Sequence, residues 1–165
     1  MWESTKLWPK PYYSDLLDRL SNEYQDYKLV YLGPCEEYWI GDNTINLSGA
    51  TNLEELKILL KYARLHIGPE GGMIHLRHVI SRAPSCVLFG STSVKFYGYP
   101  ENLNLEVKTC CDHCEWLTDN WNEFCSKKTQ STVCDKLKQL LPSQVFEAIQ
   151  QELGDNKESI CVRSL

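Results

Sequence analysis

The sequence lacks three kinds of feature, and each absence narrows the class of protein. No window approaches the roughly 20 consecutive apolar residues that a membrane-spanning helix needs, so no membrane span is predicted. The first residues, Met1-Trp2-Glu3-Ser4-Thr5-Lys6, lack the basic region and apolar core of a secretory signal peptide. Basic residues do not predominate either. The 17 Lys and Arg face 22 Asp and Glu, and the net charge of −5 argues against a nucleic-acid partner. We therefore expect a cytoplasmic protein.

What is present is an ordinary globular composition with a regular alternation of elements. The 165 residues correspond to about one domain, with 42% apolar and 24% charged residues. Short apolar segments, which predict strands, alternate with segments of helical period. Strands are expected at 28–32, 44–47, 65–67, 85–89 and 103–107, and helices at 11–24, 51–63, 73–82 and 143–153. This order predicts βαβ units, and hence an α/β fold with a parallel sheet covered on both faces.

The helix expected after residue 50 carries a start signal. Thr51 followed by Glu54 has the pattern of a capping box, in which each side chain satisfies a free backbone N–H of the first turn.

The most informative stretch runs from Leu65 to Leu76, where an apolar strand leads through a glycine-rich turn into a helix. Gly68, Gly71 and Gly72 can adopt positive φ and allow a ligand close to the main chain. The helix start presents unpaired N–H groups, which favour a phosphate or another anion. Glu70 would repel a bare phosphate, so we expect it to face the hydroxyls of a ligand with both phosphate and sugar. The alternative is a tight connection that binds nothing.

Two basic side chains are candidates for the same ligand. His75, on the first turn of the helix, could donate to a phosphate, and Lys6, fixed before Trp8-Pro9, could supply a point charge to a pyrophosphate. A structural histidine and a solvated surface lysine are the alternatives. No strand precedes Lys6, so the chain is expected to start in the middle of a fold.

Eight cysteines are many for this length, and five of them crowd into one polar segment. Cys111, Cys114, Cys125 and Cys134 offer four thiolates, the number that a tetrahedral zinc or single-iron site requires. A bound metal would also explain how a polar segment without a clear period is ordered. Disulfides and unbound thiols remain alternatives, and Cys110 leaves open which of two neighbours is the ligand.

Taken together, these motifs resemble glycosyltransferase family 9, the heptosyltransferase family. The resemblance covers about residues 4–153, and its matching elements are Lys6-x-Trp8-Pro9, Asn46-Leu47-Ser48-Gly49, Thr51 to Leu56, Ala63 to Leu76 and Val87 to Thr92. The cysteine segment is similar to that of the family members that carry a cysteine-bound metal. These include the protein heptosyltransferases that modify autotransporters, in which the metal is iron.

The resemblance implies the Rossmann-like C-terminal half of a GT-B fold, the half that binds the nucleotide sugar. Residues 1–109 would form the donor-binding domain, 110–135 the cysteine-rich metal loop, 136–154 the closing helices and 155–165 a tail. Lys6 would neutralise the donor diphosphate, and Glu70 would meet donor hydroxyls. The rest of the substrate-binding set would lie at the helix start and includes Gly71, Gly72, Met73 and His75. Residues near Cys35-Glu36-Glu37 and Leu47-Ser48 would border the base and ribose.

The implied reaction is an inverting glycosyl transfer from a nucleotide-diphosphate sugar, ADP-heptose by family default, to a glycan or protein acceptor, as in lipopolysaccharide biosynthesis. Lys6 and His75 would be its catalytic residues here. The general base lies on an N-terminal domain that this sequence lacks, so the chain alone would be an incomplete enzyme. Its edge bearing Lys6, Glu70 and Gly90-Ser91-Thr92 should then be open to solvent. A non-catalytic nucleotide-sugar-binding module and a metal-stabilised interaction protein are the alternatives.

Overall fold

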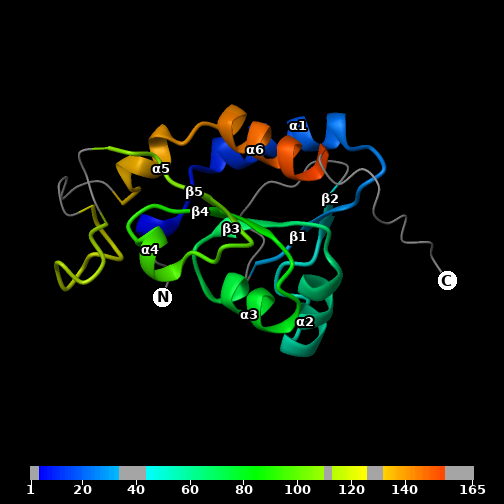
Figure 1. Cartoon of the computed structure of the whole chain (residues 1–165), viewed down its shortest axis with the longest axis horizontal. Coiled ribbons are helices and arrows are strands. Elements are labelled where there is room, and N and C mark those ends of the chain that lie inside the picture. The colour runs from blue at the N-terminus through cyan, green and yellow to red at the C-terminus, as the bar shows by residue number, and fades with distance from the viewer. Residues whose placement is uncertain (1–3, 34–43, 110–112, 126–131, 155–165) are drawn as a thin grey trace.

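The computed structural model describes residues 4–33, 44–109, 113–125 and 132–154 (Figure 1). The predictions that concern Cys35-Glu36-Glu37, Cys111 and the tail lie outside these residues. The elements in chain order are η1 (Ser4–Lys6), α1 (Lys10–Glu23), β1 (Leu29–Tyr31), β2 (Thr44–Asn46), α2 (Leu53–Tyr62), β3 (His66–Pro69), α3 (Gly72–Ile80), β4 (Ser85–Leu88), α4 (Val94–Tyr97), β5 (Leu103–Leu105), α5 (Asp135–Gln139) and α6 (Pro142–Gly154).

Every strand pair in the described residues is parallel. Strands β1 and β2 form one small sheet, and β3, β4 and β5 form a second with β4 in the centre. Figure 1 shows α1 and α6 over one face and α2 and α3 over the other. The predicted α/β fold with a parallel sheet covered on both faces is therefore confirmed, although its strands divide into two hydrogen-bonded groups.

The central strand β4 explains how both faces are filled. Its four residues are all buried, as expected for a strand between two helical layers. Because successive side chains point to opposite faces, Cys86 and Leu88 join the core of α1 and α6, while Val87 packs with Ile74 of α3. The strand thus ties both helical layers together.

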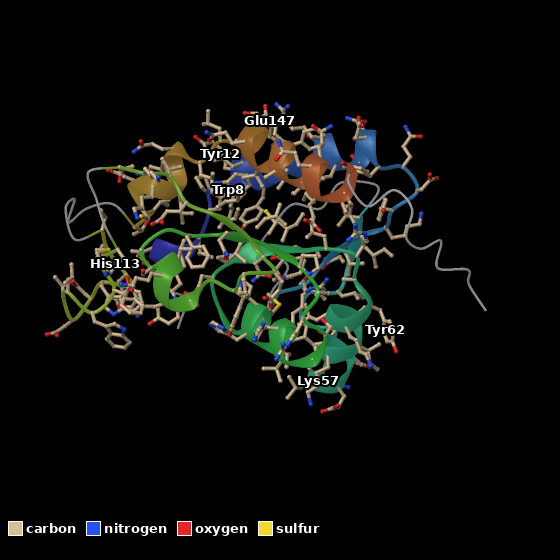
Figure 2. The ribbon with its side chains drawn as sticks, viewed as in Figure 1. Trp8, Tyr12, Lys57, Tyr62, His113 and Glu147 are labelled. Atoms are coloured by element: carbon tan, nitrogen blue, oxygen red, sulfur yellow. The ribbon has the colours of Figure 1, made fainter. Side chains whose placement is uncertain are left out.

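Trp8 fixes the start of the chain against this core. Its side chain is 1% exposed, and its indole N–H donates to the carbonyl of Leu140, 2.9 Å away. Tyr12 and Tyr13 pack edge-on against its ring with centroids at 5.5 and 5.0 Å. Figure 2 shows Trp8 and Tyr12 close together. A buried tryptophan so held gives Lys6, two residues earlier, a defined position.

Some local predictions need correction. The capping box of α2 lies one residue later than predicted: Asn52 accepts from the N–H groups of Glu54 and Glu55, and the Glu55 carboxylate accepts from the N–H of Asn52. The first turn therefore begins after Asn52 and not after Thr51. Strand β3 ends two residues later than predicted, the other four strands end one or two residues earlier, and the short helix α4 was not predicted.

Within the described ranges, none of the helices combines the length and hydropathy needed to cross a membrane.

Candidate functional site

The glycine turn joins the end of β3 to the start of α3. Gly71 caps the helix without a side-chain hydrogen bond, at φ 168°, which is extended backbone. Among the described glycines a left-handed φ occurs at Gly49 and not in this turn, so Gly68, Gly71 and Gly72 do not use their freedom to adopt such a φ here. The glycines matter for space instead. A Cβ on Gly71 or Gly72 would meet no atom of the described residues within 4 Å, so within this part of the chain the N-terminus of the nine-residue α3 faces open space.

Lys6, Glu70 and His75 come together beside this turn. Lys6 Nζ lies 2.9 Å from one carboxylate oxygen of Glu70, and His75 Nε2 lies 3.1 Å from the other. Glu70 is 5% exposed, so the ion pair is partly shielded from water. The structure thus brings three of the predicted site residues into one cluster, although Glu70 lies inside it and not on an open surface.

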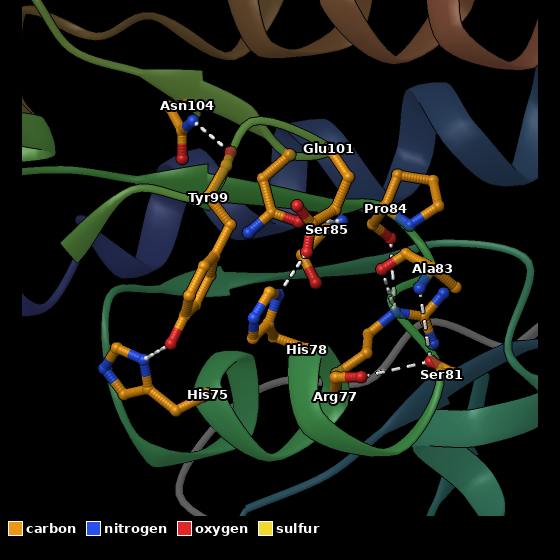
Figure 3. Close-up of polar contacts among 11 residues, drawn as sticks. His75, Arg77, His78, Ser81, Ala83, Pro84, Ser85, Tyr99, Glu101 and Asn104 are labelled. Carbon is orange, nitrogen blue, oxygen red and sulfur yellow. Dashed lines mark hydrogen bonds and ion pairs between the residues drawn. The ribbon is translucent and has the colours of Figure 1, made fainter.

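Tyr99 holds the second nitrogen of His75. Its hydroxyl lies 2.8 Å from His75 Nδ1 (Figure 3). A carboxylate can only accept, so Nε2 of His75 donates to Glu70, and in the neutral ring Nδ1 accepts from the Tyr99 hydroxyl. Both ring nitrogens are therefore engaged, and a direct contact of His75 with a phosphate would have to replace one of these bonds. No sequence pattern indicated Tyr99, because it lies 24 residues further along the chain.

A second histidine continues the cluster on the same helix. The ring of His78 stacks on Tyr99 with centroids 3.6 Å apart, and its Nδ1 pairs with Glu101 (Figure 3). Partial burial raises the pKa of Glu101, but the hydrogen bond with His78 and the nearby Arg82 charge outweigh it, so the pKa is lowered. His78 thus helps to fix Tyr99.

The far end of α3 is locked by a buried arginine. Arg77 donates to the carbonyls of Leu60 and Ala63, where α2 ends. It also donates to those of Ala83 and Pro84, before β4 (Figure 3). Its burial, and then the nearby Arg64 charge, lower its pKa to about 10. This one side chain joins α2, α3 and the start of β4.

The predicted open edge is closed by the chain itself, which corrects that expectation. Ser91 and Thr92 are 1% and 2% exposed. The Thr5 hydroxyl lies 3.2 Å from that of Ser91, whose carbonyl accepts from the N–H groups of Cys114 and Glu115. Residues 113–125, which we call the cysteine segment, therefore cover the end of β4 together with η1, while Lys6 keeps a 14% exposed side chain.

Trp121 of the cysteine segment borders the cluster directly. Lys6 Nζ lies 5.6 Å from the centroid of its ring, within the range of a cation–π contact. Trp121 is 6% exposed, so it packs the segment onto the fold, and it does so against Lys6.

Three of the four predicted metal ligands are described, and all three are buried. Burial raises the pKa of the Cys134 thiol, and the nearby Cys114 and Cys125 thiols raise it further, whereas the N–H groups of Lys136 and Leu137 lower it. Among the described residues no group of three or more His, Cys, Asp or Glu side chains is arranged to hold a metal. Cys111, the fourth predicted ligand, lies outside these residues.

Comparison with known proteins gives a consistent relationship. A Salmonella typhimurium protein, lipopolysaccharide heptosyltransferase 2, is 27% identical over 103 residues, which cover 55% of this chain and 29% of the relative. ADP-heptose lps heptosyltransferase II of E. coli shares 18% identity and a TM-score of 0.70, over 93% of this chain and 44% of that one.

Two further structures show the same fold. The glycosyltransferase of family 9 from Veillonella parvula shares 20% identity and a TM-score of 0.68, over 92% of this chain and 43% of that one. TibC, a dodecameric iron-containing heptosyltransferase in complex with ADP-D-beta-D-heptose, shares 16% identity and a TM-score of 0.71, over 92% and 42%. The chain therefore spans less than half the length of each of these relatives. The family model for glycosyltransferase family 9 matches residues 2–131, and the chain accordingly belongs to this heptosyltransferase family.

Proposed function

We propose that the chain binds a nucleotide-diphosphate sugar in front of α3 and supplies the donor half of an inverting glycosyltransferase. One observation carries this proposal: the Lys6–Glu70–His75 cluster lies beside a helix N-terminus that faces open space at Gly71 and Gly72. An amide-rich, positively polarised helix start beside a lysine is suited to a diphosphate. Met73, in the first turn of α3, belongs to the same proposed binding set.

Lys6 has the geometry to serve Glu70 and a ligand together. The ion pair with Glu70 holds the Lys6 ammonium group beside the start of α3, where its positive charge can act on a bound diphosphate. Glu70 orients the amine, and Tyr99 together with His75 orients Glu70. We therefore assign His75 to holding the Glu70 carboxylate, and the phosphate contact expected from the sequence would replace one of its two ring hydrogen bonds.

In the proposed reaction an acceptor hydroxyl oxygen bonds to the anomeric carbon of the donor as the bond from that carbon to the diphosphate oxygen breaks. Negative charge builds up on the departing diphosphate. Lys6 and the N–H groups at the start of α3 stabilise that charge, an electrostatic contribution that can amount to several kcal/mol. The acceptor proton needs a base from outside the described cluster, and we assign this base to an acceptor domain. We propose a glycan or a protein as the acceptor.

We also propose that the cysteine segment holds a structural zinc or iron ion through Cys111, Cys114, Cys125 and Cys134. Three buried thiols that influence one another, with backbone N–H groups directed at Cys134, are the chemistry that a thiolate metal site uses. The relative TibC is described as an iron-containing heptosyltransferase. A reducing compartment keeps such cysteines in the thiol form, and on this ground we propose a cytoplasmic location.

Calorimetric titration of the metal-replete chain with ADP, GDP and UDP tests the binding proposal. We expect one nucleotide to bind at least about tenfold more tightly than the other two, because all three carry the same diphosphate and differ in the base that the site recognises. Equal, weak binding of all three would show that the cluster recognises no nucleotide. Metal analysis of the same sample should give one ion per chain.

A further inference from the structure

We infer that Glu115 and Thr92 form a second polar subsite at the carboxyl edge of β4 and bind hydroxyl groups of the donor sugar. This inference rests on the proposed function, because it names the part of that ligand which the cysteine segment would hold. It gives the segment a role in ligand binding beyond that of a metal loop.

The first observation is a carboxyl group without a partner. Glu115 is 7% exposed, and its Oε2 is buried with no hydrogen bond or ion pair within the described part of the chain. Removing such an oxygen from water without a donor costs free energy, and buried polar groups are nearly always paired. In contrast, Oε2 of Glu70 faces Lys6 Nζ at 2.9 Å. Glu115 therefore needs a donor that a ligand can supply.

The second observation is the location of Thr92. Its hydroxyl is likewise buried without a hydrogen bond, in a residue 2% exposed. Thr92 follows Ser91, whose carbonyl accepts from the N–H of Glu115 at 3.2 Å. The two orphan groups thus come from neighbouring stretches of backbone, one on the loop after β4 and one on the cysteine segment.

The third observation connects this pair to the Lys6 cluster. Pro69 and Leu88 are aligned in register, so Glu70 and the loop after β4 leave the same edge of the sheet. Ser91 contacts Thr5, the residue before Lys6, and Trp121 of the same segment lies against Lys6. In parallel α/β sheets ligands bind beyond this edge. We therefore place the sugar of a ligand whose diphosphate lies at Lys6 beside Thr92 and Glu115, where it takes up the two buried groups when the covering segment admits it.

The chemistry of the pair selects the hydroxyls of a sugar. A carboxylate repels a diphosphate but accepts hydrogen bonds from neutral hydroxyls, and a threonine hydroxyl both donates and accepts. An ordered hydroxyl on a carboxylate gives a charge-assisted hydrogen bond. The subsite should therefore distinguish ADP-heptose from ADP while leaving the affinity for ADP unchanged.

Calorimetric titrations of ADP and ADP-heptose into the metal-replete chain test this inference. In Glu115→Gln we expect the Kd for ADP-heptose to rise about tenfold or more, with the Kd for ADP within about twofold of the unaltered chain. Thr92→Val should act in the same direction with a smaller effect. Asp119→Asn, at an exposed carboxylate of the same segment, is the matched control and should change neither value.

Three results would overturn the inference, and they separate it from the proposed function. Unchanged ADP-heptose affinity in both variants, or an equal loss for ADP and ADP-heptose, would refute the subsite while leaving nucleotide binding intact. If the unaltered chain binds neither ligand, the proposed function fails and the subsite fails with it. Thermal unfolding of each variant identifies loss of folding, and Glu115→Gln should unfold no earlier than the unaltered chain because it removes an unpaired buried charge.

Discussion

His66 should make the stability of the fold depend on pH in a defined window. It starts β3, the strand that leads to Glu70, and it is buried with Nδ1 lacking a hydrogen bond among the described residues. Burial, and then the Arg77 charge, lower its pKa from 6.5 to about 4. Between these values the unfolded chain binds a proton at this position and the folded chain does not, so stability falls as the pH falls.

The size of the effect follows from the two pKa values. A drop of the His66 pKa from 6.5 to about 4 corresponds to about 3 kcal/mol of the free energy of unfolding. This stability is fully present above pH 6.5 and is lost progressively down to about pH 4. Urea unfolding of the unaltered chain and of His66→Leu should be compared at about pH 7 and about pH 4. Between these two pH values the free energy of unfolding of the unaltered chain should fall by about 3 kcal/mol more than that of the variant. Equal losses in both proteins would refute the buried neutral histidine.

Three further substitutions test separate parts of the structure. Gly71→Ala should change the free energy of unfolding by no more than about 1 kcal/mol yet weaken ADP binding at least tenfold, because the methyl group enters the open space before α3. The control Gly154→Ala, also beside open space, should change neither the free energy of unfolding nor ADP binding. Unaltered ADP binding in Gly71→Ala would place the ligand elsewhere. Arg77→Met should cost about 3 kcal/mol or more in urea unfolding, since it leaves buried carbonyls of α2 and of the turn before β4 without donors; a cost under about 1 kcal/mol would contradict this. Cys114→Ala should lower the melting temperature sharply and release the metal, measured by thermal unfolding and metal analysis, and an unchanged melting temperature would argue for free thiols.

The regular part of the fold was predictable because its signals are local. Alternating apolar runs and helical periods predicted the β3–α3 and β4 regions within a few residues, and the Asn52 capping box differs from the prediction by one position. The four-residue helix α4 was missed since so short a helix has no measurable period and depends on its packing.

The sequence predicted which residues belong to the candidate site but not how they contact one another. Motif order pointed to Lys6, Glu70 and His75, but their mutual contacts join residues 64 positions apart through tertiary structure. The roles of Tyr99 and Trp121 follow from those contacts and from no local pattern. The closure of the edge by η1 and the cysteine segment was unpredictable for the same reason, since it depends on backbone hydrogen bonds to Ser91.

Whether Lys6 binds the diphosphate is the central question, and one pair of titrations addresses it. ADP and adenosine should be titrated into the metal-replete chain, into Lys6→Met and into the control Lys10→Met, which alters an exposed lysine outside the cluster. Far-UV circular dichroism should first establish that each variant is folded. We predict that Lys6→Met weakens ADP binding about tenfold or more and leaves adenosine binding unchanged, while Lys10→Met changes neither. Equal ADP affinity in a folded Lys6→Met variant and in the unaltered chain would contradict the proposed donor site.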